Sequence, residues 1–249
     1  MVIRKTETMY KFSIFFIFII PFLTGCFSAT PVAKLEPVEE NVQWNYGQQM
    51  VYKTKDSITV GMAFSRSTDR YIIFDMTFTN HSDSELLVKP ETFHYQCKNE
   101  YGTLLGAKLY ATDPEEKLLD IDKQLSKTNA KKANHAVLSL ISTTTEVSAA
   151  IASLDESPED RAEISDDIRR NQYYRSQMRN DMEADSWSLN EQRDFWSNTV
   201  LRKTTLKPGF YVEGKVFFAR NECAAYCNFS VPVNGNSFEY SYKQTLIKP

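Results

Sequence analysis

The period of the apolar residues changes twice along this chain, and the two changes limit what it can fold into. Before Asp113 and after about residue 200, apolar residues come in short runs, several of them alternating with polar ones. Between these points they recur every three or four residues, which is the spacing of one helix face. Strands on both sides of a helical block most simply form one β unit with an insertion. The sequence therefore predicts a mainly β protein of the α+β class, divided at 48–112, 113–200 and 201–249.

The strand pattern is clearest at Tyr71–Asn80. Four large apolar residues of this segment point to one face, and mostly polar residues point to the other, as in a half-buried strand. The sequence Asn234-Gly235-Asn236 is typical of the turn of a β-hairpin. We expect further strands at 50–54, 57–64, 86–88, 92–97, 104–110, 210–219, 226–233 and 237–247.

The central block carries three signals for helix starts. Asp113 and Ser157 are each followed by a proline and by an acidic residue three positions later, and Ser188 is followed by Glu191. Such residues satisfy the free N–H groups of a first helical turn. We expect two or three helices, with the polar segment 127–134 as a candidate break. The helices should pack on each other and on one flank of the strands through Leu118, Ile121, Leu125, Val137, Ile141, Val147, Ile151 and Leu154.

The first 25 residues have the layout of a secretory signal. A charged opening precedes the apolar run 12–23, which is shorter than the roughly 20 residues that a membrane-spanning helix needs. The ending Leu23-Thr24-Gly25-Cys26 resembles the lipobox of bacterial lipoproteins. That resemblance implies cleavage before Cys26 and lipid, such as palmitate, on its thiol, so that acyl chains hold the protein on a membrane. The alternative is an ordinary cleaved signal with an incidental cysteine.

The segment after the signal is rich in proline and charge, without periodicity. This composition predicts a flexible tether over residues 26–47. An acidic cluster directly after the lipidated cysteine is associated with surface export in Bacteroides-type lipoproteins, and this chain has none there. We therefore expect an outer-membrane anchor that faces the periplasm, with the cell surface as the alternative.

The net charge of the chain bears on the kinds of molecule that it can bind. The chain has 29 Lys+Arg and 32 Asp+Glu, and removal of residues 1–25 takes three basic residues and one acidic one, leaving 26 against 31, or −5. An acidic chain argues against nucleic acid as a partner, because nucleic acid recruits clustered Lys and Arg.

The cysteines are candidates for a disulfide. In an oxidising compartment we expect a disulfide from Cys97 to Cys223 or Cys227, with a local Cys223–Cys227 bridge as the alternative. The histidines show no metal-ligand spacing, so we expect neither a metal nor a cofactor.

A second resemblance concerns the two groups of strands. Their motifs resemble the immunoglobulin-like domains found on bacterial lipoproteins of mostly unknown function, over roughly 100 residues in two pieces. The resemblance implies an immunoglobulin-like β-sandwich interrupted by the helices, and it supplies no catalytic residues. The motifs are Phe74-x-Met76-x-Phe78-x-Asn80-x-Ser82, Val88-x-Pro90-x-x-Phe93, Tyr101-Gly102-Thr103 and Leu206-x-Pro208-Gly209-x-x-Val212-x-Gly214-x-Val216-x-Phe218.

Two groups of residues are candidate contact sites. The first group is a partner-binding stripe or, alternatively, a solvated helix face whose arginines pair with acidic residues one or two turns earlier. Its members are Arg169, Arg170, Tyr173 and Tyr174. The second group is the pair Trp187 and Trp196, whose rings could stack on sugars or fill a core.

The sequence contains no hydrolase elbow, metalloprotease helix, phosphate loop or dinucleotide fingerprint. We therefore expect a protein that is not an enzyme. The preferred function is a membrane-anchored module that binds or scaffolds another envelope protein. A lipoprotein that binds carbohydrate or a small ligand is the alternative, and an uncharacterised hydrolase is the second alternative.

Overall fold

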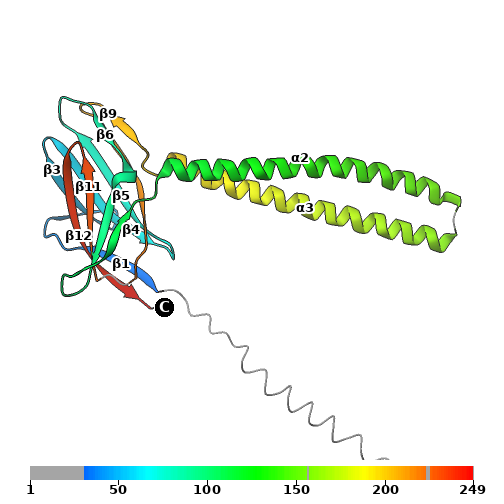
Figure 1. The fold of residues 1–249 in the computed structure, drawn as a ribbon, viewed down its shortest axis with the longest axis horizontal. Helices are drawn as coiled ribbons and strands as arrows, with labels where there is room; N and C mark the ends of the chain where they lie inside the picture. Colours follow the sequence, from blue (N-terminus) through cyan, green and yellow to red (C-terminus); the bar gives the residue numbers. More distant parts are fainter. Residues whose placement is uncertain (1–30, 156, 223–224, 249) are drawn as a thin grey trace, which may run out of the picture.

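The computed structural model describes residues 31–155, 157–222 and 225–248, and it has an α+β architecture. The signal segment and Cys26 lie outside the described residues. The strands gather at one end of the molecule, and two long helices project from them as an antiparallel hairpin (Figure 1). These helices are α2 (Pro114–Ala152) and α3 (Pro158–Asn198), joined through the 3-10 turn η3 (Ser153–Asp155).

Two five-stranded sheets make up the β unit, and neighbouring strands within each run antiparallel. The first sheet has the order β1 (Val32–Pro37), β12 (Asn236–Ile247), β11 (Tyr226–Val233), β7 (His94–Lys98) and β8 (Leu104–Tyr110). The second has the order β10 (Tyr211–Ala219), β5 (Tyr71–Asn80), β4 (Ile58–Ser67), β3 (Gln48–Lys55) and β2 (Val42–Asn45). A short antiparallel pair, β6 (Leu86–Val88) and β9 (Thr204–Leu206), belongs to neither of these sheets. The 3-10 turn η2 (Pro90–Thr92) lies between β6 and β7.

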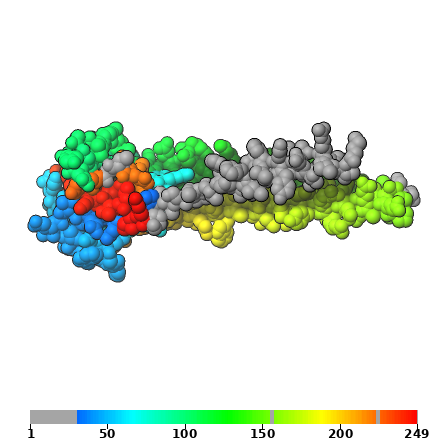
Figure 2. Space-filling model, turned by 90° about the horizontal axis from the view of Figure 1, so that it is seen from below, coloured from blue at the N-terminus to red at the C-terminus, as the bar shows by residue number. Residues whose placement is uncertain are grey.

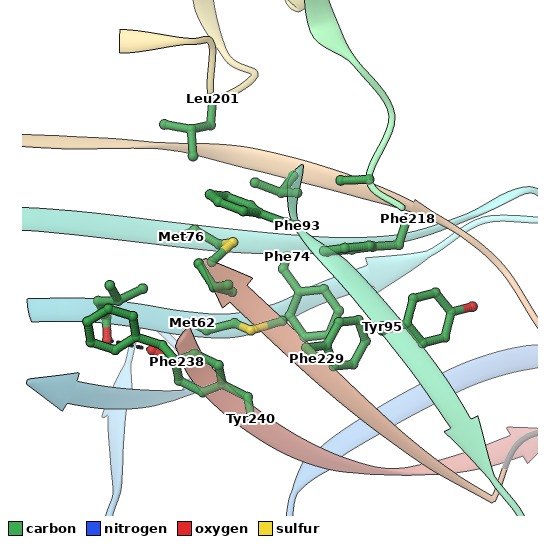
Figure 3. Close-up of a cluster of buried hydrophobic side chains, with 14 of the residues drawn as sticks. Met62, Phe74, Met76, Phe93, Tyr95, Leu201, Phe218, Phe229, Phe238 and Tyr240 are labelled. Carbon is green, nitrogen blue, oxygen red and sulfur yellow. Dashed lines mark hydrogen bonds between the residues drawn. The ribbon is translucent and has the colours of Figure 1, made fainter. Parts of the chain in front are cut away.

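The larger core lies between the two sheets and is built on aromatic rings (Figure 3). The alternation predicted for Tyr71–Asn80 is confirmed, since Ile72, Phe74, Met76 and Phe78 are all buried. The ring centre of Phe74 lies 4.6 Å from that of Phe229 and 5.0 Å from that of Tyr242, in edge-on contacts. Such pairs add to the stabilisation that burial alone provides.

Polar groups inside this core are hydrogen-bonded, as burial requires. The Tyr240 hydroxyl donates to the carbonyl oxygen of Val60 at 2.8 Å, and the Tyr242 hydroxyl donates to that of Met62 at 3.0 Å. These bonds run from β12 in one sheet to β4 in the other. They therefore fix how the two sheets face each other.

Two of the three expected helix starts are confirmed. The Asp113 carboxylate accepts hydrogen bonds from the backbone N–H groups of Glu115 and Glu116, and the Ser157 hydroxyl accepts one from that of Asp160. The third start, at Ser188, is wrong because α3 continues through it. The expected break at 127–134 is also absent from α2. A serine can remain inside a helix when its side chain faces solvent or the partner helix, so the capping pattern alone was not decisive.

The tether predicted over 26–47 is partly replaced by strands. Val32–Pro37 forms β1, which pairs with the C-terminal strand β12 from Val32 opposite Ile247 to Pro37 opposite Tyr242. Ala33 and Leu35 are buried. The sequence gives little local sign of this strand because its pairing partner lies at the other end of the chain.

Both ends of the helical hairpin are fixed to one strand, β10. The Thr112 N–H donates to the carbonyl oxygen of Phe217 at 2.8 Å on the entering side. On the leaving side, the Lys215 N–H donates to Thr199 at 2.9 Å, and the Leu201 N–H donates back to Lys215 at 2.9 Å. The two ends therefore leave the sheet close together.

A second, smaller core fills the root of the hairpin. The ring of Trp196 lies 4.9 Å from that of Phe217, which projects from the outer face of β10. Ile73, on the outer face of the neighbouring strand β5, is buried beneath the same helices. The expectation that the helices cover a flank of the strands holds only for this root, since the rest of the hairpin extends beyond the sheets (Figure 1).

Gly214 allows the chain after α3 to approach β10. A Cβ atom at this position would lie 2.7 Å from the backbone nitrogen of Leu201, a distance that real Cβ contacts essentially never show. We predict that Gly214→Ala lowers the free energy of unfolding by about 1–3 kcal/mol, because the backbone must move to admit the methyl group. Urea unfolding followed by tryptophan fluorescence measures this loss. Glu213→Ala, an exposed neighbour on the same strand, is the control, and an equal effect of both changes would contradict the prediction.

Candidate functional site

The candidate site is the part of the hairpin beyond its root. At 1.5 Å per residue, helices of 39 and 41 residues extend roughly 60 Å. Figure 2 shows this arm as a narrow projection beside the compact β unit. An arm of this kind has two surfaces to account for, namely the inner face that joins the helices and the outer face that meets solvent.

The inner face of α2 becomes polar beyond the root. Its partly or fully buried positions repeat with spacings of three and four residues, the pattern of a coiled-coil seam. The first three positions are apolar, and those after them are mostly polar. They are Leu118, Ile121, Leu125, Thr128, Lys132, His135, Ser139, Ser142 and Glu146.

The strongest interaction along this seam is an ion pair between the helices. Arg175 of α3 donates two hydrogen bonds to the Glu146 carboxylate of α2, at 2.6 and 2.7 Å. The two side chains are only 20% and 12% exposed. A bidentate arginine–carboxylate pair fixes geometry as well as charge, so it sets the register of the two helices in this region.

Between Glu146 and the root, the helices leave an open cavity of about 670 Å³. Its lining combines basic groups with hydroxyls and a carboxylate, including Lys132, His135, Ser139, Arg175, Arg179 and Glu183. The polar seam therefore packs loosely here, unlike the apolar root.

The outer face of distal α2 is apolar and exposed. We define the outer stripe as Val137, Leu140, Thr144, Val147, Ile151 and Leu154, which again repeat with spacings of three and four residues. Its five aliphatic residues are 55–70% exposed, as is the adjacent Ile141 at 58%. On a helical wheel the stripe lies about 130° from the inner seam. The sequence prediction that the helices pack through their apolar residues is therefore wrong for Val137, Ile141, Val147, Ile151 and Leu154. It holds for Leu118, Ile121 and Leu125 at the root.

A shift of phase explains this difference. From Leu125 to Val137 the chain advances twelve residues, which rotates the apolar face by roughly 120° around the helix. The apolar residues of the root therefore face α3, and those of the distal half face solvent. Helical spacing was a correct signal for a helix, but it did not reveal that two different faces were being marked.

The arginines and tyrosines considered as a contact stripe all lie on α3. Arg169 pairs with Asp166 at 2.5 Å and Arg170 with Asp167 at 2.6 Å, on an exposed helix face. Tyr173 and Tyr174 are exposed. This arrangement is compatible with both interpretations, so their role as partner contacts stays a prediction.

The structure separates the two candidate tryptophans. Trp196 is 6% exposed and packs in the hairpin root, so its ring is not accessible to a ligand. Trp187 is 69% exposed, and its indole N–H donates to Glu191 at 2.6 Å. Among the two, only Trp187 remains available for stacking on a ligand.

Two of the cysteines considered for a disulfide face each other across neighbouring strands. Cys97 on β7 and Cys227 on β11 are direct register partners, and both are buried free thiols. Directly opposed residues of antiparallel strands lie about 4.5–5.5 Å apart at Cα, within the span of a disulfide. The hydrogen bond with Cys97, together with burial, raises the pKa of the Cys227 thiol. Cys223 lies outside the described residues.

We predict that oxidised glutathione converts the Cys97 and Cys227 thiols into one disulfide, with two glutathione thiols released. The bridge should raise the free energy of unfolding by about 2–4 kcal/mol, because it closes a long loop in the unfolded chain. Peptide mass spectrometry and urea unfolding measure the two effects. Cys223→Ser should behave like the parent chain, and a Cys97–Cys223 or Cys223–Cys227 peptide would contradict the pairing.

The Glu146–Arg175 pair makes the hairpin sensitive to acid. The hydrogen bonds from Arg175 hold the pKa of Glu146 below its ordinary value of 4.5. A carboxyl whose pKa is lower in the folded state stabilises that state above its unfolded pKa, and this contribution is lost as pH falls through the folded pKa. We predict that Glu146→Gln lowers the melting temperature at pH 7 and that the difference from the parent chain shrinks as the pH falls below 4.5, the ordinary pKa of this carboxyl. Circular dichroism measures both. Asp167→Asn, which removes an exposed pair, should have a smaller effect, and equal effects would contradict the prediction.

Within the part of the chain that the structure describes, no group of three or more His, Cys, Asp and Glu side chains could hold a metal ion. Neither α2 nor α3 has the length and apolar character needed to cross a membrane. Comparison with protein families, curated proteins and solved structures found no match to this chain.

Proposed function

We propose that this chain is a lipid-anchored envelope protein that binds another protein through its helical hairpin and catalyses no reaction. The outer stripe carries the proposal. Exposed apolar patches on soluble proteins commonly mark interaction sites, and a stripe with heptad spacing is suited to a helical partner. The two-sheet unit then serves as the mount of the arm.

The way in which the hairpin is attached supports a binding role for the hairpin and a supporting role for the two-sheet unit. The arm is held by backbone hydrogen bonds and by its own core at the root, and the remainder extends into solvent (Figure 1). A stretch of roughly 60 Å that adds nothing to the main core is costly to order, since each residue fixed loses about 1–2 kcal/mol of conformational free energy. A binding role would explain why the chain keeps it.

The finer fold and the location are part of the same proposal. We propose an immunoglobulin-like arrangement for the two-sheet unit, supported by the antiparallel pairing in both sheets and by the core that they enclose. We also propose lipid on Cys26 and a periplasm-facing outer-membrane anchor, with the cell surface as the alternative. The signal-like segment 1–25 and the lipobox-like ending support this address.

In-cell crosslinking tests the function. A tagged full chain is compared with a variant in which residues 114–198 are replaced by a short Gly/Ser linker. The linker can be short because Thr112 and Thr199 bond to Phe217 and Lys215, two residues apart on β10. We predict a protein adduct for the full chain that is lost in the variant.

Two controls make this comparison specific. Membrane fractionation should show equal anchoring of both chains, and protease resistance should show an intact β unit in the variant. An adduct that persists without the hairpin would move the binding site to the strands. The absence of any protein adduct in both chains would contradict a protein-binding function.

Binding of a carbohydrate or small ligand is the second candidate, and the exposed Trp187 favours it. An indole face can stack on a sugar ring. A glycan array tests this directly, with Trp187→Ala as the variant expected to lose binding and the exposed Trp44→Ala as its matched control.

A further inference from the structure

We propose that the partner of the outer stripe is a second copy of this chain, and that two copies associate through α2 in an antiparallel arrangement. This inference rests on the proposed protein-binding function and names the partner. Each copy would contribute Val137, Leu140, Val147, Ile151 and Leu154 to one shared seam.

The spacing of the outer stripe indicates that its partner is a helix. Positions 137, 140, 144, 147, 151 and 154 alternate intervals of three and four residues, so they form one a/d seam of a coiled coil. α2 therefore carries two such seams. The inner one is occupied by α3, and nothing in the chain's described residues covers the outer one.

The hydroxyl groups of Thr144, which belongs to the outer stripe, and of Ser148, which lies beside it, are already hydrogen-bonded inside the helix. The Thr144 hydroxyl donates to the carbonyl oxygen of Leu140 at 2.9 Å, and the Ser148 hydroxyl donates to that of Thr144 at 3.0 Å. Burying these hydroxyls against another helix would leave neither donor without a partner, which avoids the usual cost of burying a polar group. The face is therefore suited to burial and not only to contact with water.

The size of the surface is adequate for a stable contact. The aliphatic side chains of the stripe, with Ile141 and the small residues between them, present on the order of 700 Å² of accessible surface, and a standard interface buries about 800 Å² per partner. The largest apolar patch on a typical monomer is only about 300–600 Å². Pairing along the full stripe would bury most of it.

Charge favours a copy of the same chain over a lipid surface. Residues 133–154 contain a single Asp, Glu, Lys or Arg, namely Glu146, and Arg175 neutralises it. Helices that lie on anionic lipid carry Lys or Arg beside their apolar face, and this segment has none. An uncharged face can meet its own copy without repulsion, as a two-fold symmetric contact requires.

The size of the β unit favours the antiparallel direction. Packed helices lie about 8–10 Å apart, and the β unit at the root is wider than the hairpin that projects from it (Figure 1). Antiparallel copies place the two β units at opposite ends of the shared seam, whereas parallel copies would bring them side by side.

Crosslinking of the full chain in its membrane tests the pairing. Thr144→Cys places a thiol near the centre of the stripe, where an antiparallel pair brings the two copies together, and a bismaleimide then joins them. We expect an adduct with twice the mass of one chain. A chain with the cysteine at Asn171, exposed on α3, should form at least tenfold less adduct.

The matched variants are made in the Thr144→Cys chain. Leu140→Glu with Ile151→Glu should reduce the adduct at least tenfold, because it places charges in the seam. Leu138→Glu is the control, since Leu138 is equally exposed on the same helix but lies off the stripe. All three positions face solvent, so circular dichroism should show unchanged helix content. Equal loss in both variants would overturn the proposal.

The remaining outcomes also overturn it and differ in what they say of the proposed function. An adduct with another protein instead of a second copy leaves the protein-binding function standing. If lipid, without any second protein, protects the thiol of Thr144→Cys from a water-soluble maleimide, the stripe contacts the membrane instead. No protein adduct, without lipid shielding, contradicts both proposals. The direction is tested with chains that carry the cysteine at one end of the stripe, Val137→Cys or Leu154→Cys. Antiparallel copies should give an adduct between the two kinds of chain, and an adduct formed only between two Val137→Cys chains would exclude the antiparallel direction.

Discussion

The architecture depends on the way in which one strand, β10, holds both ends of the helical hairpin. Its backbone bonds to Thr112 on the entering side and to Thr199 and Leu201 on the leaving side. Its side chains point to two cores, since Phe218 lies between the sheets and Phe217 lies under the helices. A strand buried on both faces transmits the geometry of the sheets directly to the arm. The close approach at Gly214 is part of the same attachment.

The arm illustrates how packing differs when the same helix carries two faces. At the root, Trp196, Ile121 and Leu118 bury apolar surface, which stabilises the helices at about 25 cal/mol per Å². Further out, hydroxyls, charges and an open cavity replace this packing, and the Glu146–Arg175 pair keeps the helices together. Ion pairs and polar seams contribute less stability than apolar ones, but they specify register. The apolar surface of the distal half lies on the outside.

Much of the fold could be predicted because its signals are local. The alternation in Tyr71–Asn80, the turn at Asn234-Gly235 and the caps at Asp113 and Ser157 are each decided within a few residues. Strand β1 could not be found this way, because what makes Val32–Pro37 a strand is a partner at the far end of the chain. The direction of the outer stripe was missed for a similar reason. Helical spacing says that residues share a face, but only the position of α3 shows which face is inward.

The pairing of β1 with β12 has a consequence for where the protein can act. Only five residues separate Cys26 from Val32, the first residue of the edge strand. An extended chain reaches at most about 3.6 Å per residue, so a lipid on Cys26 would keep the β unit within roughly 20 Å of the membrane surface. The hairpin is about three times as long as this extended segment. The length of the hairpin, rather than that of the segment between Cys26 and Val32, would therefore set how far from its anchoring point the protein can contact a partner.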